Sequence, residues 1–447
     1  MIGLNTTLEM REETGHPVRI GLIGAGQMGT DVVAQTMMMK GVEVVAIADI
    51  DSDRARAAYE IGGVDKEVVG AESPTDADEA VAAGRRIAAA DFEVIADMQT
   101  VDVMLEATGV PEVGSRAALR AARSGQQLAM MNVETDITVG PILRWYAEQY
   151  DVHYALAAGD EPAACKELYD FADALGFTIV AAGKGKNNPL DRHARPTDAT
   201  WVEEAARRGL SPTMLIEFVD GSKTMIEMAA VSNATGLVPD VRGMHGPVTH
   251  REILERVFRL EDDGGILKQM GVVDYGVGKV APGVFLIVRT DHPRLREAMV
   301  LRDMGPGPYY TLFRPYHLCS IEVPLTCALL AIEGRSNMAP LDRLTSEVVA
   351  VAKQHLTPGD TLEGIGGSSY YGLIDRYEVA QTEGLLPIGL AKGAKVIRPV
   401  AVDVPIRLDD VLLSEPSVLL TLRRLQDRWF SGEIEPDALL KSMDRLR

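Results

Sequence analysis

The stretch from Val18 to Asp51 constrains the fold of this chain more than any other. Val18 to Ile23 is a short apolar run rich in β-branched residues, which is typical of a buried parallel strand. A loop of sequence GAGQMG follows at once, then a helical stretch and a second apolar run, Val42 to Ala48, which ends at Asp49. Strand, glycine loop, helix, strand and terminal acid in this order predict a βαβ unit that binds a dinucleotide.

Each position of the glycine loop has a physical role in this prediction. Gly24 permits the tight turn, Gly26 lets the backbone approach the pyrophosphate, and Gly29 lets helix and strand pack closely. The helix that begins near Gln27 and Met28 offers unpaired N–H groups and the positive end of its dipole to the phosphates. We therefore expect all five residues to bind the cofactor.

Asp49 bears on which dinucleotide is bound. A carboxylate at the end of the second strand can accept hydrogen bonds from both ribose hydroxyls and repels a 2′-phosphate, which favours NAD. Arg54 and Arg56 lie just beyond it and could accommodate NADP. The sequence favours NAD and leaves NADP open.

Charge and cysteine content limit the partners and the compartment. The chain has 447 residues and a formal net charge of −20, which argues against nucleic acid or an anionic membrane surface as partner. Its three cysteines form no pair with metal-binding spacing, and no apolar run approaches the ~20 residues of a membrane span. A cytoplasmic protein is expected.

Alternation of apolar runs and helical stretches continues to about residue 157. The Ala-, Asp- and Glu-rich stretch between Arg54 and Asp97 is expected to be mostly helical, and strands are expected at Val101 to Ala107, Gln127 to Met131 and Val152 to Ala157. This order predicts an α/β fold with a doubly wound parallel sheet, a Rossmann domain over residues 1–157. Loops after such strands border the nicotinamide, so Thr108, Gly109 and Asn132 are further candidates for cofactor binding.

The pattern changes twice beyond this domain. Residues 158–340 mix helices with short strands, which predicts an α+β domain for substrate binding and dimerisation. Residues 341–447 contain short β runs cut by Pro-Gly and Gly turns, which predict a small all-β module followed by a C-terminal helix. The expected elements of the middle domain are strands at 177–182, 215–218 and 283–288 and a helix at 220–234.

A run of lysines, glycines and asparagines follows the expected strand at 177–182. Lys184 and Lys186 alternate with glycines, and Asn187 and Asn188 come next. We interpret this run as a flexible cationic loop that binds a phosphate or carboxylate of the substrate. The alternative is a solvated turn with surface lysines.

Four more residues are candidates for substrate binding or proton transfer. Lys223 follows the turn at Asp220 and opens an apolar helix, where partial burial would lower its pKa and suit it to acid/base work. Arg314 and His317 could donate to a substrate or cofactor oxygen. The alternatives are an ordinary helix residue for Lys223 and a structural histidine for His317.

Three carboxylates lie at the ends of two expected strands. Glu134, Asp160 and Glu161 together could hold a hard cation such as Mg or Mn through oxygen ligands, and Glu161 could also act in catalysis. The alternative is that Asp160 caps a helix and Glu161 occupies its first turn.

Motifs spread over most of the chain resemble those of one family. The segments ATG, MMNVETD, AAGDEP, AGKGKNNP, EFVDGSKTMIEMA, MHGP and RPYHLCSIEVP lie between Thr14 and Asp427. They resemble the 1-deoxy-D-xylulose 5-phosphate reductoisomerase-like proteins, relatives of homoserine dehydrogenase that carry a C-terminal SAF module of the β-clip type. The resemblance implies a homodimeric NAD(P)-dependent enzyme, in some members with a divalent metal.

The same resemblance implies a reaction. It suggests a reductoisomerase or oxidoisomerase that joins hydride transfer to rearrangement of a ketose phosphate or of a branched sugar acid such as apionate. Lys223 falls where homoserine dehydrogenases carry their catalytic lysine, whereas Val133 replaces their lysine after Asn132. Two alternatives stay open: an alcohol dehydrogenase of the homoserine type without rearrangement, and a nucleotide-sensing module without turnover.

Overall fold

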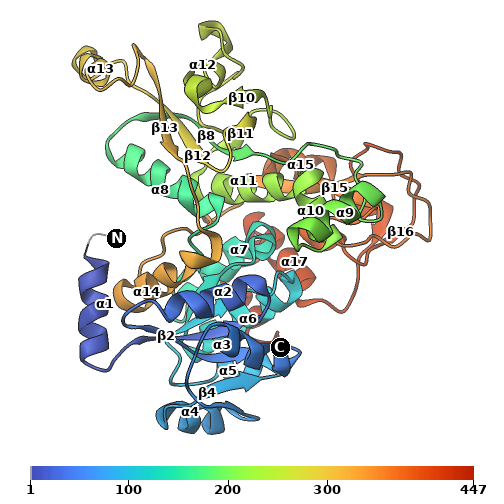
Figure 1. Cartoon of the computed structure of the whole chain (residues 1–447). Helices are drawn as coiled ribbons and strands as arrows, with labels where there is room; N and C mark the ends of the chain where they lie inside the picture. Colours follow the sequence, from blue (N-terminus) through green and yellow to red (C-terminus); the bar gives the residue numbers. More distant parts are fainter. Residues whose placement is uncertain (1–2, 447) are drawn as a thin grey trace. The chain divides into compact units, whose positions relative to one another are not determined.

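The computed structural model describes residues 3–446, which form two compact units (Figure 1). The first unit combines the residues up to Ala163, the stretch Leu318–Asp342 and the residues from Val418 onward. The second unit combines Ala164–His317 and Arg343–Ser417. The sequence predicted three consecutive domains, whereas each of these units is assembled from separated stretches of the chain.

A seven-stranded parallel sheet forms the centre of the first unit. Its strand order is β3-β4-β2-β1-β5-β6-β7, and every neighbouring pair is parallel. This confirms the predicted doubly wound α/β sheet. The strands are β1 (Val18–Ile23), β2 (Val42–Ala48), β3 (Val68–Gly70), β4 (Arg86–Ala89), β5 (Val103–Glu106), β6 (Gln127–Met130) and β7 (Tyr154–Leu156).

Two of these strands were not expected. The sequence predicted a mostly helical stretch between residues 54 and 97, but it contains β3 and β4. Both strands have only three or four residues, so an apolar run of the usual strand length never appears.

Helices alternate with the strands and begin at recognisable caps. The side chains of Asp51, Ser73 and Asp91 each accept a backbone N–H of the helix that follows. These helices are α2 (Gln27–Thr36), α3 (Ser52–Ile61), α4 (Pro74–Ala82), α5 (Phe92–Ala96), α6 (Pro111–Ser124) and α7 (Val133–Glu148).

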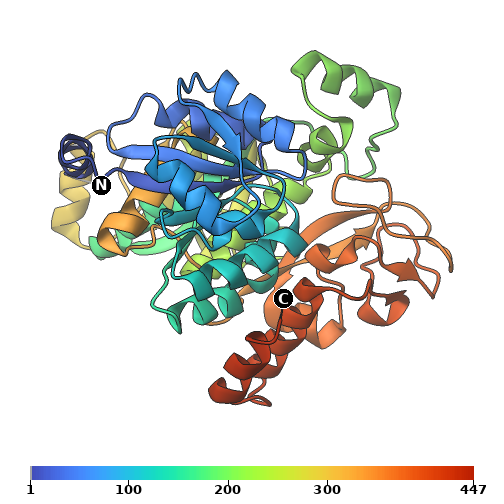
Figure 2. The same cartoon turned by 90° about the horizontal axis from the view of Figure 1, so that it is seen from below.

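Segments from distant parts of the chain complete the first unit. Helix α14 (Val323–Glu333) packs on β1, β5 and β6, and α17 (Val418–Phe430) packs on α6 and α7 (Figures 1 and 2). The core beneath α14 joins side chains of Val323 and Cys327 to those of β1 and β5. The remaining helices of this unit are α1 (Leu4–Glu13) and α18 (Pro436–Met443).

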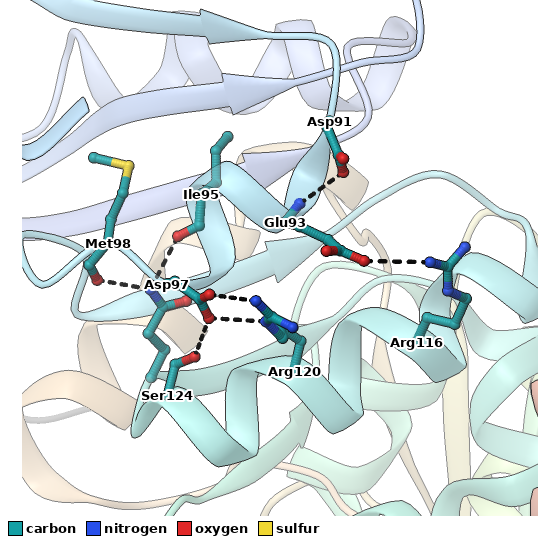
Figure 3. A network of polar contacts seen from close by, with 9 residues as sticks. Asp91, Glu93, Ile95, Asp97, Met98, Arg116, Arg120 and Ser124 are labelled. Atoms are coloured by element: carbon teal, nitrogen blue, oxygen red, sulfur yellow. Dashed lines mark hydrogen bonds and ion pairs between the residues drawn. The ribbon is translucent and has the colours of Figure 1, made fainter. Parts of the chain in front are cut away.

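A polar network fastens α5 to α6 (Figure 3). Asp97, which ends α5, accepts hydrogen bonds from the guanidinium of Arg120 and from Ser124 Oγ, the latter at 2.7 Å. The buried Gln126 amide donates to the carbonyl oxygens of Ile95 and Met98 at 3.0 and 2.9 Å. Bonds from the Arg120 side chain hold the pKa of Asp97 below its usual range.

The second unit is built on a six-stranded mixed sheet. Its main order is β10-β11-β8-β12-β13, and β9 pairs with β11. Strand β8 is central: it runs parallel to β11 and antiparallel to β12. The strands are β8 (Thr178–Lys186), β9 (Val238–Pro239), β10 (Val248–His250), β11 (Val272–Lys279), β12 (Val284–Arg289) and β13 (Tyr309–Arg314).

One expected strand of this unit is a helix. Residues 215–218 lie in α10 (Pro212–Val219), so the strand prediction was wrong. Ser211 caps that helix through the N–H of Met214, and Pro212 occupies its first turn, which together are a helix-start signal. The other helices are α8 (Glu161–Ala174), α9 (Ala199–Arg208), α11 (Ser222–Thr235), α12 (Leu254–Val257) and α13 (Pro293–Val300).

The segment Arg343–Ser417 belongs to the second unit and packs on α11. Its strands pair antiparallel, as expected of a β module, but two short helices interrupt them. Its identity as a SAF module stays a prediction. The elements are β14 (Ser346–Ala352), β15 (Tyr370–Arg376), α15 (Tyr377–Glu383), α16 (Ile388–Ala391), β16 (Lys395–Val396) and β17 (Val411–Leu412). No helix within residues 3–446 is long and apolar enough to cross a bilayer.

Asp97→Asn should lower the free energy of unfolding by about 1 kcal/mol at pH 7, because a charged acceptor for Arg120 is lost from a site that solvent partly screens. The native pKa of Asp97 is lowered, so its stabilising effect is present above about pH 4 and disappears as the pH falls further. Urea unfolding of both proteins from pH 7 to pH 3 should show the difference shrink. Glu93→Gln, at the more exposed Glu93–Arg116 pair, is the control and should change little; an equal loss there would contradict this assignment.

Candidate functional site

The glycine loop between β1 and α2 lies at the point where the strand order reverses. Strands β2, β3 and β4 lie on one side of β1 in the sheet, and strands β5, β6 and β7 lie on its other side. Ligands of open α/β sheets bind outside the carboxyl ends of the strands at this reversal. Gly24 takes φ +100°, and a Cβ there would lie 2.9 Å from the carbonyl of Ala107. Gly29 packs so closely that its Cβ would overlap the carbonyl oxygen of Gly24.

The N-terminus of α2 is open toward solvent. Gly26 occupies its N-cap position, and no side chain caps the helix. Gly26, Gln27 and Met28 are exposed, and no atom lies within 4 Å of the position that a Cβ of Gly26 would take. A pyrophosphate can come close to the backbone N–H groups here and bind at the positive end of the helix dipole. The five predicted loop residues therefore fit a dinucleotide.

Asp49 fixes this loop as well as offering a carboxylate to a ribose. Its Oδ2 accepts the N–H of Ala25 at 2.8 Å, and its Oδ1 accepts the N–H of Asp51 at 3.0 Å. Arg56 donates to the carbonyl oxygen of Val68 at 2.8 Å, and Arg54 lies 3.8 Å from the carboxylate of Asp51. Both arginines that could accept a 2′-phosphate thus have partners of their own.

Thr108 and Gly109 follow β5 and are held by a buried carboxyl. The N–H of Thr108 donates to Glu106 Oε1 at 2.9 Å, and its hydroxyl donates to the same oxygen. Asn132 was expected to face the nicotinamide, but only 1% of its surface is exposed. Its side chain instead accepts the N–H of Thr135 at 3.1 Å and caps α7, a preference of asparagine at helix starts.

Only two of the three carboxylates expected to hold a metal come together: Asp160 and Glu161 belong to one group of candidate ligands, and Glu134 does not. Glu134 is half-buried in the first turn of α7, and within residues 3–446 it forms no group with Asp160 and Glu161 that could hold one cation. Asp160 Oδ1 accepts the N–H of Glu161, which begins α8. That arrangement matches the alternative expectation of a helix start.

The expected cationic loop after residue 182 is a buried strand. Strand β8 continues to Lys186, and both lysines are about 4% exposed. The glycines serve close packing rather than flexibility. A Cβ at Gly183 would lie 2.5 Å from the carbonyl oxygen of Asp274, and one at Gly185 would overlap the backbone of Ala281. The prediction of a flexible loop was therefore wrong for Lys184 and Lys186, and anion binding by this run stays a prediction.

Lys184 forms a buried ion pair. Its Nζ donates to Glu227 Oε2 on α11, and their side chains are 5% and 1% exposed. Removing a charge from water is costly unless it is paired, so each partner makes the burial of the other tolerable. Sequence reasoning missed Glu227, although a carboxylate inside the apolar helix SKTMIEMAAV was a visible signal.

Lys186 has a backbone partner and a lowered pKa. It donates to the carbonyl oxygen of Phe218 at the end of α10. Burial, and next to it the neighbouring charge of Lys184, lower the pKa of Lys186 to about 8. A lysine with this pKa is partly neutral near physiological pH and can accept or donate a proton.

The start of α11 is held by a second buried ion pair. Lys353, just after β14, donates to Asp220 Oδ2 and to the carbonyl oxygen of Gly367, each at 2.8 Å, and both charged side chains are fully buried. Asp220 also accepts the N–H of Ser222. Asp220, predicted to bind substrate, is thus committed to Lys353, which sequence reasoning missed. Lys223 is half-buried in the first turn of α11.

Asn187, Asn188, Arg314 and His317 are the remaining candidates. Asn187 is exposed, whereas Asn188 accepts from Arg208 at 2.8 Å. Arg314, at the end of β13, donates to Glu167 at 2.9 Å and stacks over Tyr316. The Nδ1 of His317 lies 3.1 Å from the carbonyl oxygen of Pro282. No described contact assigns Arg314 or His317 a chemical role, so their candidacy stays a prediction.

Comparisons with known proteins give one family match and short or distant relatives. Residues 159–323 match the model of "Oxidoreductase DRL, catalytic domain". Inositol 2-dehydrogenases of two strains of Klebsiella pneumoniae are 42% identical over 52 residues, which are 11% of this chain and 15% of those proteins. The chain thus matches only a small part of the length of these curated relatives.

Two solved structures are similar in chain trace. The myo-inositol dehydrogenase from Lactobacillus casei in complex with NAD(H) and myo-inositol is 16% identical, with a TM-score of 0.34, over 68% of this chain and 75% of that one. A dehydrogenase from Chromobacterium violaceum is 13% identical, with a TM-score of 0.37, over 72% and 90% of the two chains.

The sequence matches correct the resemblance drawn from the motifs. The matching proteins are an oxidoreductase catalytic domain and inositol 2-dehydrogenases, and not 1-deoxy-D-xylulose 5-phosphate reductoisomerases or homoserine dehydrogenases. The predicted membership of that reductoisomerase-like family is therefore wrong, and the rearrangement that it implied has no support. The glycine loop behind part of the resemblance occurs in many dinucleotide-binding proteins.

Breaking the Lys184–Glu227 pair from either side should destabilise the second unit strongly. Lys184→Met and Glu227→Met should each cost about 3 kcal/mol or more, because each leaves one buried charge without its counter-ion. The double variant should regain most of that loss. Urea unfolding of the four proteins forms the test, with Asp170→Asn at the more exposed Lys166–Asp170 pair as a control that changes little. Additive losses would show that the two charges do not depend on each other.

Proposed function

We propose that the chain is an NAD(P)-dependent oxidoreductase that acts on a CH–OH group of a small anionic polyhydroxy compound. The observation that carries this proposal is the glycine loop at the reversal of the parallel sheet, with the open N-terminus of α2 behind it. The match of residues 159–323 to an oxidoreductase catalytic domain supports it independently.

Acid/base chemistry of the second unit supports the same reaction class. When an alcohol is oxidised, the nicotinamide ring takes up the hydride and a base must take up the hydroxyl proton. Lys186, with its pKa near 8, is our candidate for that base, and Lys223 is the second candidate.

NAD is the proposed cofactor rather than NADP. The carboxylate of Asp49 ends β2, where it would accept from ribose hydroxyls and repel a 2′-phosphate. The contact of Arg56 with Val68 supports the same preference, since this guanidinium is directed toward β3. Inositols are natural first substrates to try, because the curated relatives act on inositol.

Cofactor choice should change with the charge at Asp49. We expect NAD⁺ to bind more tightly than NADP⁺, and Asp49→Asn to weaken NAD⁺ binding by about tenfold while strengthening NADP⁺ binding, since the repulsion of the 2′-phosphate is lost. Asparagine keeps an acceptor for the N–H of Ala25. Calorimetric titration with both dinucleotides measures this. Asp53→Asn, in the first turn of α3, is the control and should leave both affinities unchanged; a wild-type preference for NADP⁺ would refute the role of Asp49.

Turnover should depend on the ionisation of Lys186. With NAD⁺ and a panel of inositols and sugar acids, the nicotinamide absorbance band should appear, and kcat/KM for oxidation should rise with pH to a plateau above pH 8, because only the neutral amine accepts a proton. Lys186→Met should lose at least about 100-fold in rate together with this inflection. Lys279→Met, on the exposed end of β11, is the control and should keep both. An unchanged inflection in Lys186→Met would exclude Lys186 as the base.

A further inference from the structure

Three buried polar atoms in the first unit lack a hydrogen-bond partner among residues 3–446. They are Glu106 Oε2, Asn132 Nδ2 and Thr135 Oγ1. The three residues are at most 1% exposed. A buried polar atom without a partner is destabilising, so three in one place point to a bound group that pairs with them.

Gly114 of α6 marks where these atoms converge. A Cβ on this glycine would lie 2.5 Å from Thr135 Oγ1, 3.2 Å from Asn132 Nδ2 and 3.3 Å from Glu106 Oε2. The asparagine amide donates, the hydroxyl donates or accepts, and the carboxyl does either according to its protonation. A single water next to Gly114 has the donors and acceptors to pair with all three.

Glu106 connects this cluster to the cofactor side of the sheet. It is the last residue of β5 and pairs in register with Ile23 of β1, at the reversal of strand order. Its second oxygen, Oε1, accepts both the N–H and the hydroxyl of Thr108. One carboxyl thus holds the Thr108–Gly109 turn with one oxygen and faces Asn132 and Thr135 with the other.

The carboxyl of Glu106 titrates in the neutral range. Burial raises its pKa to about 7, against the opposing effect of the Thr108 donors. The Asn132 side chain also lowers the pKa of Glu106. Glu134 on α7 and Tyr154 on β7 are the ionisable groups that interact with Glu106, and Asp136 on α7 interacts with Tyr154. Asp136 bonds to Tyr154 at 2.8 Å, and burial raises its pKa to about 7 as well.

We propose that Glu106, Asn132 and Thr135, with a water held beside Gly114, form a proton-holding site whose ionisation is coupled to the charge of the nicotinamide ring. This inference rests on the proposed dinucleotide binding. The oxidised ring is cationic and the reduced ring is neutral. The oxidised cofactor therefore stabilises ionised Glu106 and releases its proton on binding, and the reduced cofactor does not. Glu106 is a positioning residue in this scheme, because it touches the Thr108 turn rather than the reacting atoms.

The sign of the effect follows from this coupling. A cation next to Glu106 lowers its pKa in the complex, so affinity for NAD⁺ rises with pH up to about pH 7 and is constant above it. NADH affinity stays level over the same range. If the coupling amounts to one pKa unit, the ratio of the two Kd values changes about tenfold between pH 5.5 and pH 8.

The first measurement needs only the wild-type protein. Calorimetric titration of NAD⁺ and NADH at pH 6.5, in two buffers of different ionisation enthalpy, counts the protons released. Release of a fraction of a proton with NAD⁺ and none with NADH is expected. Equal release with both cofactors would overturn the inference, whereas failure of either to bind at any pH would overturn the proposed function instead.

Two matched variants assign the proton. Glu106→Gln keeps the size of the side chain and an acceptor for Thr108, but it cannot titrate, so proton release and the pH dependence of NAD⁺ affinity should vanish. Asp136→Asn removes the other buried carboxyl of similar pKa and should keep both effects. If Asp136→Asn instead abolishes them and Glu106→Gln does not, the proposed site is wrong.

A third variant tests the water. Gly114→Ala places a methyl group 2.5 Å from Thr135 Oγ1, where it would displace the water and leave Glu106 less well solvated. The rise in NAD⁺ affinity should then move to higher pH by half a unit or more, because the ionised carboxyl loses a donor. An unchanged midpoint in this variant, with Glu106→Gln behaving as expected, would remove the water from the proposal.

Discussion

A parallel sheet imposes one constraint from which the first unit follows: all of its strands end at the same edge. The loops after β1, β2, β5 and β6 are therefore neighbours in space although they are far apart in sequence. The parallel sheet by itself brings four segments to this edge: the glycine loop, Asp49, the Thr108 turn and Asn132. Helices must then cover both faces of the sheet. Helix α14 returns from a distant part of the chain to pack on β1, β5 and β6, and α17 returns to pack on α6 and α7.

The βαβ start of the chain could be predicted almost to the residue because its signals are local. An apolar run, a glycine loop and a terminal acid each fall within a few residues, and β1 and β2 have the expected bounds. Strands β3 and β4 could not be found, since they are too short to show a period. Helix α10 was taken for a strand because its apolar residues outweighed the Ser211-Pro212 start signal.

Predictions about polar residues failed for a different reason: the sequence states which residues are charged, but not what lies opposite them. Lys184 and Lys186 are next to glycines, which suggested a mobile loop, yet those glycines admit the Asp274 carbonyl and the Ala281 backbone to a packed sheet. Their partners Glu227 and Phe218 lie more than 30 residues away, so only the fold brings them together. Glu106 was visible as a lone acid in the apolar run VMLEA, and such an exception to the apolar pattern deserves a chemical explanation.

The chain passes from one unit to the other four times, at residues 163, 317, 342 and 417. Helix α17, which covers α6 and α7, is synthesised about 270 residues after the end of α7. Helices α6 and α7 therefore leave the ribosome without this covering helix and stay uncovered until residues 418–430 have been made. At about 5–20 residues per second, that exposure lasts roughly a quarter of a minute to a minute. During this time the nascent first unit is a substrate for chaperones that recognise apolar surface, and it becomes a finished domain only after the second unit has been made.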